Sequence, residues 1–253
     1  MGPDNMTDAE LAAHLAACAG RILVEVRASG LFEGKALGKA GDQVANQFLV
    51  HALRSARPDD GLLSEESKDT EERLAKSRVW IVDPVDVTRE YGEERADWAV
   101  HVGLAIDGTA QIGAVALPGL EGGLVLRSDR PGAPVDHDGP PRMLVSRTRP
   151  AVEALAVAEQ LGAELVELGS AGAKAMAVVR GEAEIYLHSG GQFEWDSCAP
   201  VAVARAHGLH TSRIDSSPLV YNRRDTYMPD LLICRPEWAS PVLAAVRAMA
   251  PAD

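Results

Sequence analysis

Acidic side chains stand at the ends of three separate segments of the sequence. Glu65 follows the short apolar run 61–64, Asp83 and Asp86 close a second run, and Asp196 opens a later predicted helix. Carboxylates at strand ends gather at one rim of a sheet, and Mg²⁺ prefers such hard oxygen ligands while keeping positions for water and phosphate oxygens. A single carboxylate in such a place is more often a solvated turn residue or a helix cap. The combination therefore predicts a magnesium site for phosphate chemistry.

The stretch 80–88 carries two of these carboxylates in one turn. Pro84 fixes its own φ and removes a backbone donor, so that Asp83 and Asp86 can point the same way. The Val85 carbonyl is then free to act as a further ligand. Thr88 is predicted to open a helix whose free N–H groups face a phosphate.

Composition limits the partners. The 25 Lys and Arg residues against 37 Asp and Glu residues give a net charge of −12, and 46% of the residues are hydrophobic. That hydrophobic content excludes a disordered chain, and the acidic excess argues against binding a nucleic acid polymer or an anionic membrane. A small phosphorylated substrate remains compatible if a metal supplies positive charge.

The compartment is predicted from three further observations. No apolar run reaches the roughly 18 residues of a membrane span, and the N-terminal sequence lacks the basic start and apolar run of a signal peptide. The three cysteines are scattered, as free thiols in a reducing compartment are. We therefore expect a cytoplasmic protein.

The first half of the chain, residues 1–140, is predicted to begin with helices and continue as a mostly antiparallel sheet. Thr7 and Glu10 have capping-box spacing before a helix that reaches about Gly30. A polar, glycine-containing loop or hairpin over 34–41 is expected to precede a second helix. The predicted strands are 61–64, 79–83, 98–106, 111–117 and 123–127.

The second half, residues 141–253, follows a Gly-, Pro- and Asp-rich linker and alternates strand with helix. Its predicted strands are 143–146, 164–168, 183–188 and 231–234, and its predicted helices are 151–161, 171–179, 198–206 and 239–249. The two halves are expected to pack as one α/β (α+β) unit.

Three separated motifs together resemble the inositol monophosphatase-like superfamily of Mg²⁺-dependent, Li⁺-sensitive phosphatases. They are Ser-Glu-Glu at 64–66, Trp-Ile-Val-Asp-Pro-Val-Asp-Val-Thr at 80–88 and Trp-Asp-Ser at 195–197. Within it, Arg-Glu-Tyr at 89–91 is most similar to the CysQ-type 3′-phosphoadenosine 5′-phosphate (PAP) phosphatases, because inositol phosphatases typically carry Asn-Phe after a variable residue. The resemblance covers essentially the whole chain. It implies a layered αβαβα sandwich and the hydrolysis of PAP, or a related sulfonucleotide, to AMP and phosphate.

The resemblance also implies a ligand set for about two to three Mg²⁺ ions, with inhibition by Li⁺. Glu65, Asp83 and the Val85 carbonyl would hold one ion. Asp83, Asp86 and Asp196 would hold a second, and Glu65 would share a third. The catalytic set adds Asp42, which would hydrogen-bond Thr88 so that Thr88 orients a water and helps to deprotonate it.

Substrate contacts are implied at Asp86, Val87 and Thr88 and in the segment that begins at Gly169 and Ser170. Lys174 either touches a substrate phosphate or is a solvated lysine. Glu194 either contacts sugar hydroxyls or caps the helix that follows it. Arg223 and Arg224 either offer charge to a second phosphate or are ordinary surface residues.

Val87 departs from the pattern, because the superfamily carries Gly at this position. Glycine serves where the backbone approaches a ligand closely or adopts a positive φ, whereas valine is branched and stiff. We expect a negative φ at Val87, which would keep its N–H in place and preserve a slower or reshaped enzyme. A positive φ would favour the alternatives.

Those alternatives concern substrate and turnover. One is a superfamily phosphatase for inositol monophosphate, fructose 1,6-bisphosphate or a pathway-specific sugar or nucleoside phosphate. The other is a non-catalytic descendant that binds a phosphorylated ligand. A homodimer is possible in either case.

Overall fold

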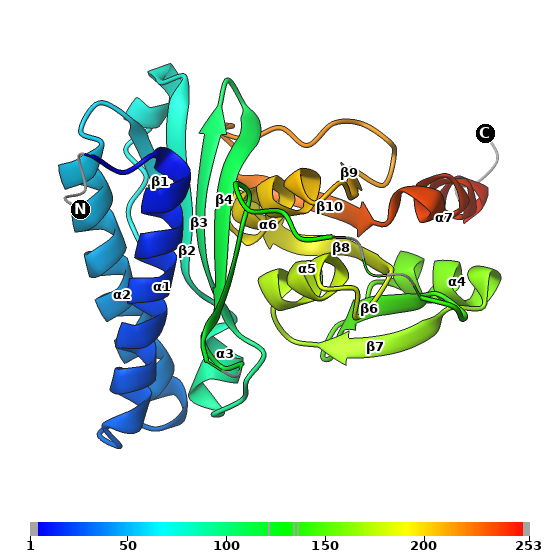
Figure 1. The fold of residues 1–253 in the computed structure, drawn as a ribbon, viewed down its shortest axis with the longest axis horizontal. Helices are drawn as coiled ribbons and strands as arrows, with labels where there is room; N and C mark the ends of the chain where they lie inside the picture. Colours follow the sequence, from blue (N-terminus) through cyan, green and yellow to red (C-terminus); the bar gives the residue numbers. More distant parts are fainter. Residues whose placement is uncertain (1–4, 121, 134, 136, 250–253) are drawn as a thin grey trace.

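The computed structural model describes residues 5–249 except 121, 134 and 136, and it is built in five layers (Figure 1). Helices α1 and α2 cover one face of a first sheet. Helices α5 and α6 fill the space between this sheet and a second one, and α4 and α7 lie on the far face of the second sheet. Residues 1–4, on which part of the signal-peptide argument rests, lie outside the described residues. The layered αβαβα sandwich is confirmed.

The elements have the following bounds. The helices are α1 (Asp8–Ala28), α2 (Gly34–Ala56), a 3-10 turn (Glu72–Ala75), α3 (Thr88–Gly92), α4 (Val152–Leu161), α5 (Ala171–Val179), α6 (Glu194–Ala206) and α7 (Pro236–Met249). The strands are β1 (Gly61–Ser64), β2 (Arg78–Asp86), β3 (Ala99–Ile106), β4 (Thr109–Leu117), β5 (Leu124–Arg127), β6 (Arg142–Ser146), β7 (Glu164–Leu168), β8 (Ile185–Phe193), β9 (His210–Ser212) and β10 (Tyr227–Cys234).

Both sheets mix parallel and antiparallel pairs. The first has the order β1-β2-β3-β4-β5, in which only the described pair β1–β2 is parallel. The second has the order β7-β6-β8-β10-β9, with β6 parallel to both of its neighbours and β10 antiparallel to both of its own. The parallel β1–β2 pair matters for the site, because both strands end at the same edge.

Three apolar cores match the five layers. One lies between α1, α2 and the first sheet, and another lies between the second sheet and helices α4 and α7. The middle core combines side chains of the first sheet, such as Ile81, with Met176 of α5, Val201 of α6 and Ile233 of the second sheet. Because both halves of the chain contribute to this core, the two sheets are held against each other by apolar burial.

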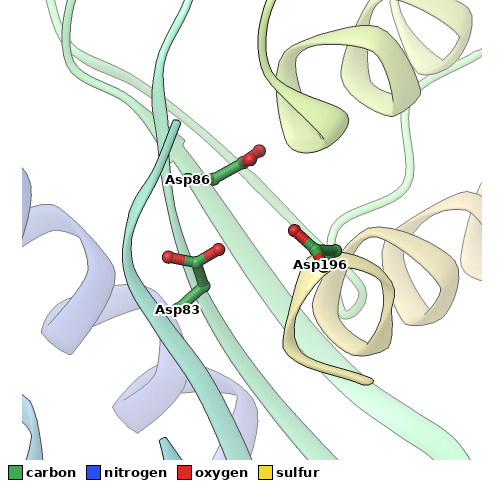
Figure 2. A group of neighbouring side chains, drawn as sticks. All are labelled: Asp83, Asp86 and Asp196. Atoms are coloured by element: carbon green, nitrogen blue, oxygen red, sulfur yellow. The ribbon is translucent and has the colours of Figure 1, made fainter. Parts of the chain in front are cut away.

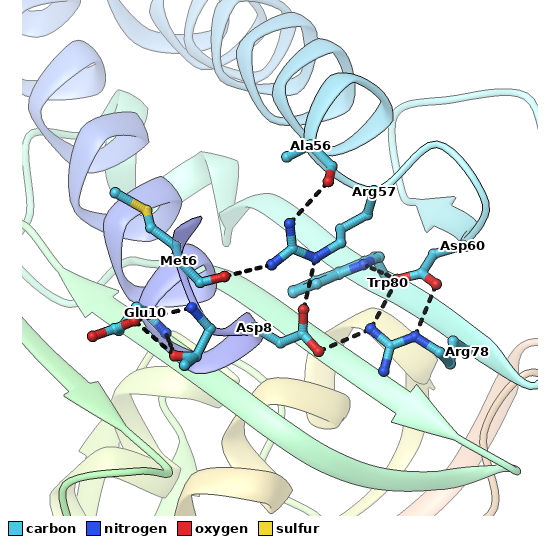
Figure 3. A network of polar contacts seen from close by, with 9 residues as sticks. Met6, Asp8, Glu10, Ala56, Arg57, Asp60, Arg78 and Trp80 are labelled. Carbon is cyan, nitrogen blue, oxygen red and sulfur yellow. Dashed lines mark hydrogen bonds and ion pairs between the residues drawn. The ribbon is translucent and has the colours of Figure 1, made fainter. Parts of the chain in front are cut away.

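A polar network far from the strand-end carboxylates ties the first helix to the sheet (Figure 3). Asp8 accepts hydrogen bonds from Arg57 at 2.7 Å and from Arg78 at 2.9 Å. Asp60 accepts from Arg78 and, at 2.9 Å, from the Trp80 indole. The start of α1, the end of α2 and the start of β2 are therefore linked by charge-assisted hydrogen bonds.

The predicted loop or hairpin over 34–41 is wrong, because α2 already begins at Gly34. The glycines of this segment permit close packing instead of breaking the helix. A Cβ on Gly38 would lie 2.6 Å from the Thr88 methyl, and one on Gly41 would lie 2.6 Å from the Tyr91 ring. Strand β9 was not predicted, and α6 begins four residues earlier than expected. Within the described part of the chain, no helix is long and apolar enough to cross a membrane.

Candidate metal centre

A β-bulge aims two carboxylates of β2 at one place. Residues three apart on a regular strand point to opposite faces of the sheet. The β2–β3 register shifts between Asp83 and Asp86, so the strand gains an extra residue there and re-aims its side chains. Pro84 lies within this bulge, and the Val85 N–H donates to Asp83 Oδ1 at 3.0 Å. The sequence Asp-Pro-Val-Asp thus places both carboxylates on the same side.

Asp83, Asp86 and Asp196 form a compact cluster of oxygen donors (Figure 2). One carboxylate oxygen from each lies within 4.8 Å of the others. Asp83 and Asp86 come from the end of β2, and Asp196 comes from the first turn of α6, where its Oδ2 accepts the Phe193 N–H at 2.7 Å. The cluster therefore joins the two halves of the chain.

The charges of this largely buried cluster repel one another. Burial and the neighbouring negative charge of Glu65 raise the pKa of Asp83 well above its ordinary value. Burial and the charge of Asp86 raise the pKa of Asp196 to about 7. Oxygen-only donors that need protons in the absence of a cation suit a divalent ion such as Mg²⁺. The residues present therefore fit the metal that the sequence predicts.

Glu65 stands beside the cluster because β1 and β2 end together. Its N–H donates to the Val82 carbonyl at 3.4 Å, which sets it next to Asp83. Desolvation by the surrounding protein and repulsion from Asp196 and Asp42 raise the pKa of Glu65 to about 8. Glu65 thus belongs to the same electrostatic cluster.

Asp86 differs from its neighbours because it is held in the charged form. Its Oδ2 accepts hydrogen bonds from the Ser170 hydroxyl and, at 2.6 Å, from the Gly172 N–H, and it lies 3.3 Å from His101 Nε2. Although burial opposes charge, the His101 charge and these hydrogen bonds lower the pKa of Asp86. The predicted Gly169–Ser170 segment therefore supports a carboxylate of the cluster.

Thr88 and Asp42 form a pair next to this cluster. The Thr88 hydroxyl donates to Asp42 Oδ2 at 3.0 Å. Burial raises the pKa of Asp42 to about 7 in spite of this hydrogen bond. Asp42 Oδ1 is buried without a hydrogen-bond partner among the described residues. A hydroxyl whose proton is held by a carboxylate keeps its own lone pairs free to accept from a water.

Val87 adopts φ +69° and ψ +73°, which is the left-handed region. The predicted negative φ is therefore wrong. The bulge before it and helix α3 after it fix the backbone in the conformation that glycine favours, and an L-residue there costs roughly 1–2 kcal/mol. Val87 thus retains a glycine backbone while adding a branched side chain.

Two cavities flank the segment 86–89. One, of about 310 Å³, lies between the two halves of the molecule, and its wall includes Asp86, Val87, Gly169, Lys174, Gly191 and Asp196. The other, of about 760 Å³, is lined from α2 and α3 and reaches Asp42 and Thr88. The carboxylate cluster and the Thr88–Asp42 pair are therefore both open to small molecules.

Lys174 and Glu194 are both buried, and the phosphate contact of Lys174 stays a prediction because Lys174 lines the smaller cavity. Lys174 is only 2% exposed, so it is not the solvated lysine of the alternative. Its Nζ donates to the carbonyls of Gly169 and Ser170 at 2.8 and 2.9 Å, and burial lowers its pKa to about 8. The Glu194 carboxylate accepts the N–H groups of Asn222 and Arg223, each at 2.7 Å, and the residue is 1% exposed. Glu194 therefore positions a loop, and we do not assign it a sugar contact.

Sequence reasoning missed two residues near the cluster. His101 is a lone histidine in an apolar strand, and only its tertiary contacts reveal its place. Arg149 lines the smaller cavity, whereas Arg224 forms an ion pair with Glu71. The positive charge beside the cavity thus comes from Arg149, Lys174 and Arg89, the last paired with Glu93, rather than from the arginine pair 223–224.

The five-layer fold and the cluster of carboxylate oxygens are those of a layered α/β protein with a site suited to divalent cations. The chain belongs to the inositol monophosphatase family, whose sequence pattern matches residues 9–249. It is 48% identical to a 3′-phosphoadenosine 5′-phosphate phosphatase of Mycobacterium leprae, over 96% of this chain and 94% of that protein. It is 49% identical to a protein of the same name from Mycobacterium tuberculosis, over 90% and 89% of the two chains.

Solved structures share the fold at lower sequence identity. CysQ from Bacteroides thetaiotaomicron, a bacterial member of the inositol monophosphatase family, superposes with a TM-score of 0.75. The two are 23% identical, and the match covers 89% of this chain and 96% of that one. This likeness supports the fold found here.

Proposed function

We propose that this protein is a Mg²⁺-dependent phosphatase that hydrolyses PAP, or a related sulfonucleotide, to AMP and phosphate. The observation that carries the proposal is the carboxylate cluster, which adjoins both the Thr88–Asp42 pair and a cavity whose wall includes Lys174 and Arg149. The two mycobacterial relatives named as PAP phosphatases support this choice of substrate.

Glu65, Asp83, Asp86 and Asp196, with the Val85 carbonyl, are the residues that would hold the metal. Bound Mg²⁺ supplies positive charge to the transferring phosphoryl group and acidifies water. The protein's own part on the attacking side falls to Thr88 and Asp42. Thr88 Oγ1 accepts a proton from the attacking water and passes its own proton to Asp42 Oδ2, 3.0 Å away. A carboxyl group with a pKa of about 7 suits that exchange near neutral pH.

The leaving group is assigned to the smaller cavity. Displacement at phosphorus is in line, so the departing oxygen leaves on the side away from the attacking water. Asp86 and Asp196 of the cluster line this cavity together with Val87, and Lys174 and Arg149 bring positive charge to its wall. A nucleotide with a second phosphate fits such charge, because that phosphate needs a cation other than the metal.

The conformation of Val87 is the reason to retain a second class of substrate as an alternative. Its side chain lines the smaller cavity and its φ is positive, which the sequence argument associates with an altered substrate or lost turnover. An inositol, sugar or other nucleoside phosphate is therefore the alternative ester, and a non-catalytic phosphate-binding protein is the alternative role.

A panel of phosphate esters tests the proposal. Phosphate release is measured from PAP, inositol monophosphate and fructose 1,6-bisphosphate with Mg²⁺, and again with added Li⁺. We expect Mg²⁺-dependent, Li⁺-sensitive release from PAP, and none from an Asp196→Asn variant. Release from another ester alone supports the alternative substrate, and binding without release supports the non-catalytic role. Unchanged activity of Asp196→Asn would refute the metal site.

The location and assembly are part of the same proposal. A cytoplasmic location agrees with the three cysteines, which are all free. A homodimer and an occupancy of about two to three Mg²⁺ ions remain our expectations, to be measured by sedimentation and by metal titration.

A further inference from the structure

His101 lies at the centre of the supports of the metal cluster. It sits in the middle of β3, is 0% exposed, and is the register partner of Asp83 on β2. Its Nδ1 lies 3.0 Å from the carbonyl oxygen of Trp195, and its Nε2 lies 3.3 Å from Asp86 Oδ2. The imidazole thus touches one ligand of the cluster and the residue directly before another, Asp196.

The two contacts span the two halves of the chain. Asp86 belongs to the first sheet, whereas Trp195 opens α6 in the second half. An imidazole is a rigid ring, so the hydrogen-bond contact at Nδ1 and the ion-pair contact at Nε2 lie a fixed distance apart. This side chain therefore lies directly between Asp86 and the start of α6, in addition to the apolar packing of α6 on the first sheet.

The His101 ring is packed closely against helix α5. A Cβ on Gly172 would lie 2.1 Å from His101 Nε2, so only glycine permits α5 to approach this closely. Ser170 and the Gly172 N–H bind the same oxygen, Oδ2, of Asp86 that faces the ring. All three contacts thus converge on one oxygen of Asp86, Oδ2.

We propose that His101 is a positioning residue that fixes the distance between Asp86 and Asp196, so that the ligand cluster is preformed for a divalent cation. Residues that hold metal ligands from behind commonly contribute 10–100-fold to metal affinity. The inference rests on the proposed metal site but not on the identity of the substrate.

Two substitutions separate the two contacts. The amide of His101→Asn reaches the position of Nδ1 and retains the Trp195 contact, whereas the longer amide of His101→Gln reaches the position of Nε2 and retains the Asp86 contact. Neither amide spans both partners. His207→Asn is the matched control, because the His207 ring contacts the Val203 carbonyl through Nδ1 at 2.8 Å, near the far end of α6.

Mg²⁺ affinity is measured by calorimetry without substrate, and each variant is checked for folding by circular dichroism and thermal unfolding. We expect both His101 variants to bind Mg²⁺ at least about 10-fold more weakly, with kcat at saturating Mg²⁺ changed much less, and the control to bind normally. Gly172→Ala pushes the ring aside without removing it, and should weaken Mg²⁺ binding if the His101 variants do not fold.

Wild-type affinity in the folded His101 variants, or in folded Gly172→Ala where they do not fold, would overturn the positioning role while leaving the proposed phosphatase intact. Normal affinity in either one of the two folded His101 variants would overturn the bridge, because one contact would then suffice. Absence of Mg²⁺ binding by the wild-type protein would overturn both proposals.

Discussion

Replacing Val87 by glycine tests the effect of the one motif position at which this chain carries valine and the superfamily pattern carries glycine. Val87 has φ +69°, and its side chain lines the cavity assigned to the leaving group. The substitution therefore removes backbone strain and opens space next to the cluster, while the Val87 N–H and the ligands of the cluster stay where they are. We expect Val87→Gly to be both more stable and more active.

The stability gain follows from two opposing terms. The left-handed conformation costs an L-residue about 1–2 kcal/mol. Glycine loses more backbone freedom than valine on folding, which offsets roughly 0.5–1 kcal/mol of that gain. The free energy of unfolding should rise by about 0.5–1 kcal/mol, which corresponds to a Tm increase of about 2–4 °C or less for a domain of this size.

The activity gain comes from the cavity. If the space freed beside the bound phosphate contributes about 1.4 kcal/mol to transition-state binding, it appears as a tenfold rise in kcat/KM. Val87→Ala keeps a Cβ in the left-handed region but loses both methyl groups, so it should gain activity without gaining stability. Ser216→Gly is the control, because Ser216 has φ +74° at an exposed position away from both cavities. It should gain stability alone.

Phosphate release and thermal unfolding of these three variants check the reasoning. If Val87→Gly is no faster than the parent on any phosphate ester, with Mg²⁺ binding unchanged, the valine is neutral and the steric argument fails. If Val87→Gly lowers the Tm while Ser216→Gly raises it, packing of the valine outweighs its backbone strain.

Three further predictions address separate parts of the molecule. Thr88→Ala should lower kcat by roughly 10²–10⁴-fold with Mg²⁺ affinity nearly unchanged; loss of Mg²⁺ affinity with a normal rate at saturating metal would contradict the assigned proton transfer. Arg149→Gln should raise KM for PAP about tenfold but leave adenosine 3′-phosphate unaffected, whereas Arg224→Gln should change neither; equal effects on both substrates would refute a second-phosphate contact. Asp8→Asn should lower the free energy of unfolding at pH 7 by about 1–3 kcal/mol. Although burial opposes charge, its hydrogen bonds to arginines lower the pKa of Asp8, so this contribution is present above the unfolded-state pKa and lost as pH falls through the folded-state value; urea unfolding at pH 7 and below pH 3 tests the sign.

The sequence was sufficient for features whose cause is local. The order Asp-Pro-Val-Asp predicts that the Asp83 and Asp86 side chains point the same way, because the proline and the spacing act within a few residues. The capping box at Thr7 and Glu10 forms as its spacing predicts, with the Thr7 N–H donating to Glu10 at 2.9 Å. Periodicity located nearly every strand and helix for the same reason.

Features set by tertiary packing were beyond the sequence. Gly38 and Gly41 are local signals for a loop, but their missing side chains admit Thr88 and the Tyr91 ring, and the helix continues through them. The φ of Val87 is imposed by the bulge and by α3 together. In the sequence His101 is a lone histidine in an apolar strand, and its contacts with α6 and Asp86 exist only in the tertiary structure.

Hydrogen bonds and raised pKa values together explain how the chain can bury Asp83, Asp86 and Asp196 side by side. Asp83 and Asp196 repel each other and have raised pKa values, so without a cation they take up protons. Asp86 alone is given donors from three directions, and its pKa is lowered. A divalent cation held here would find Asp86 the ligand most readily charged, and its charge would favour ionisation of the others. Affinity for the metal and tolerance of its absence are thus divided among different aspartates. The division depends on contacts from β3 and α5, far from the ligands in the sequence.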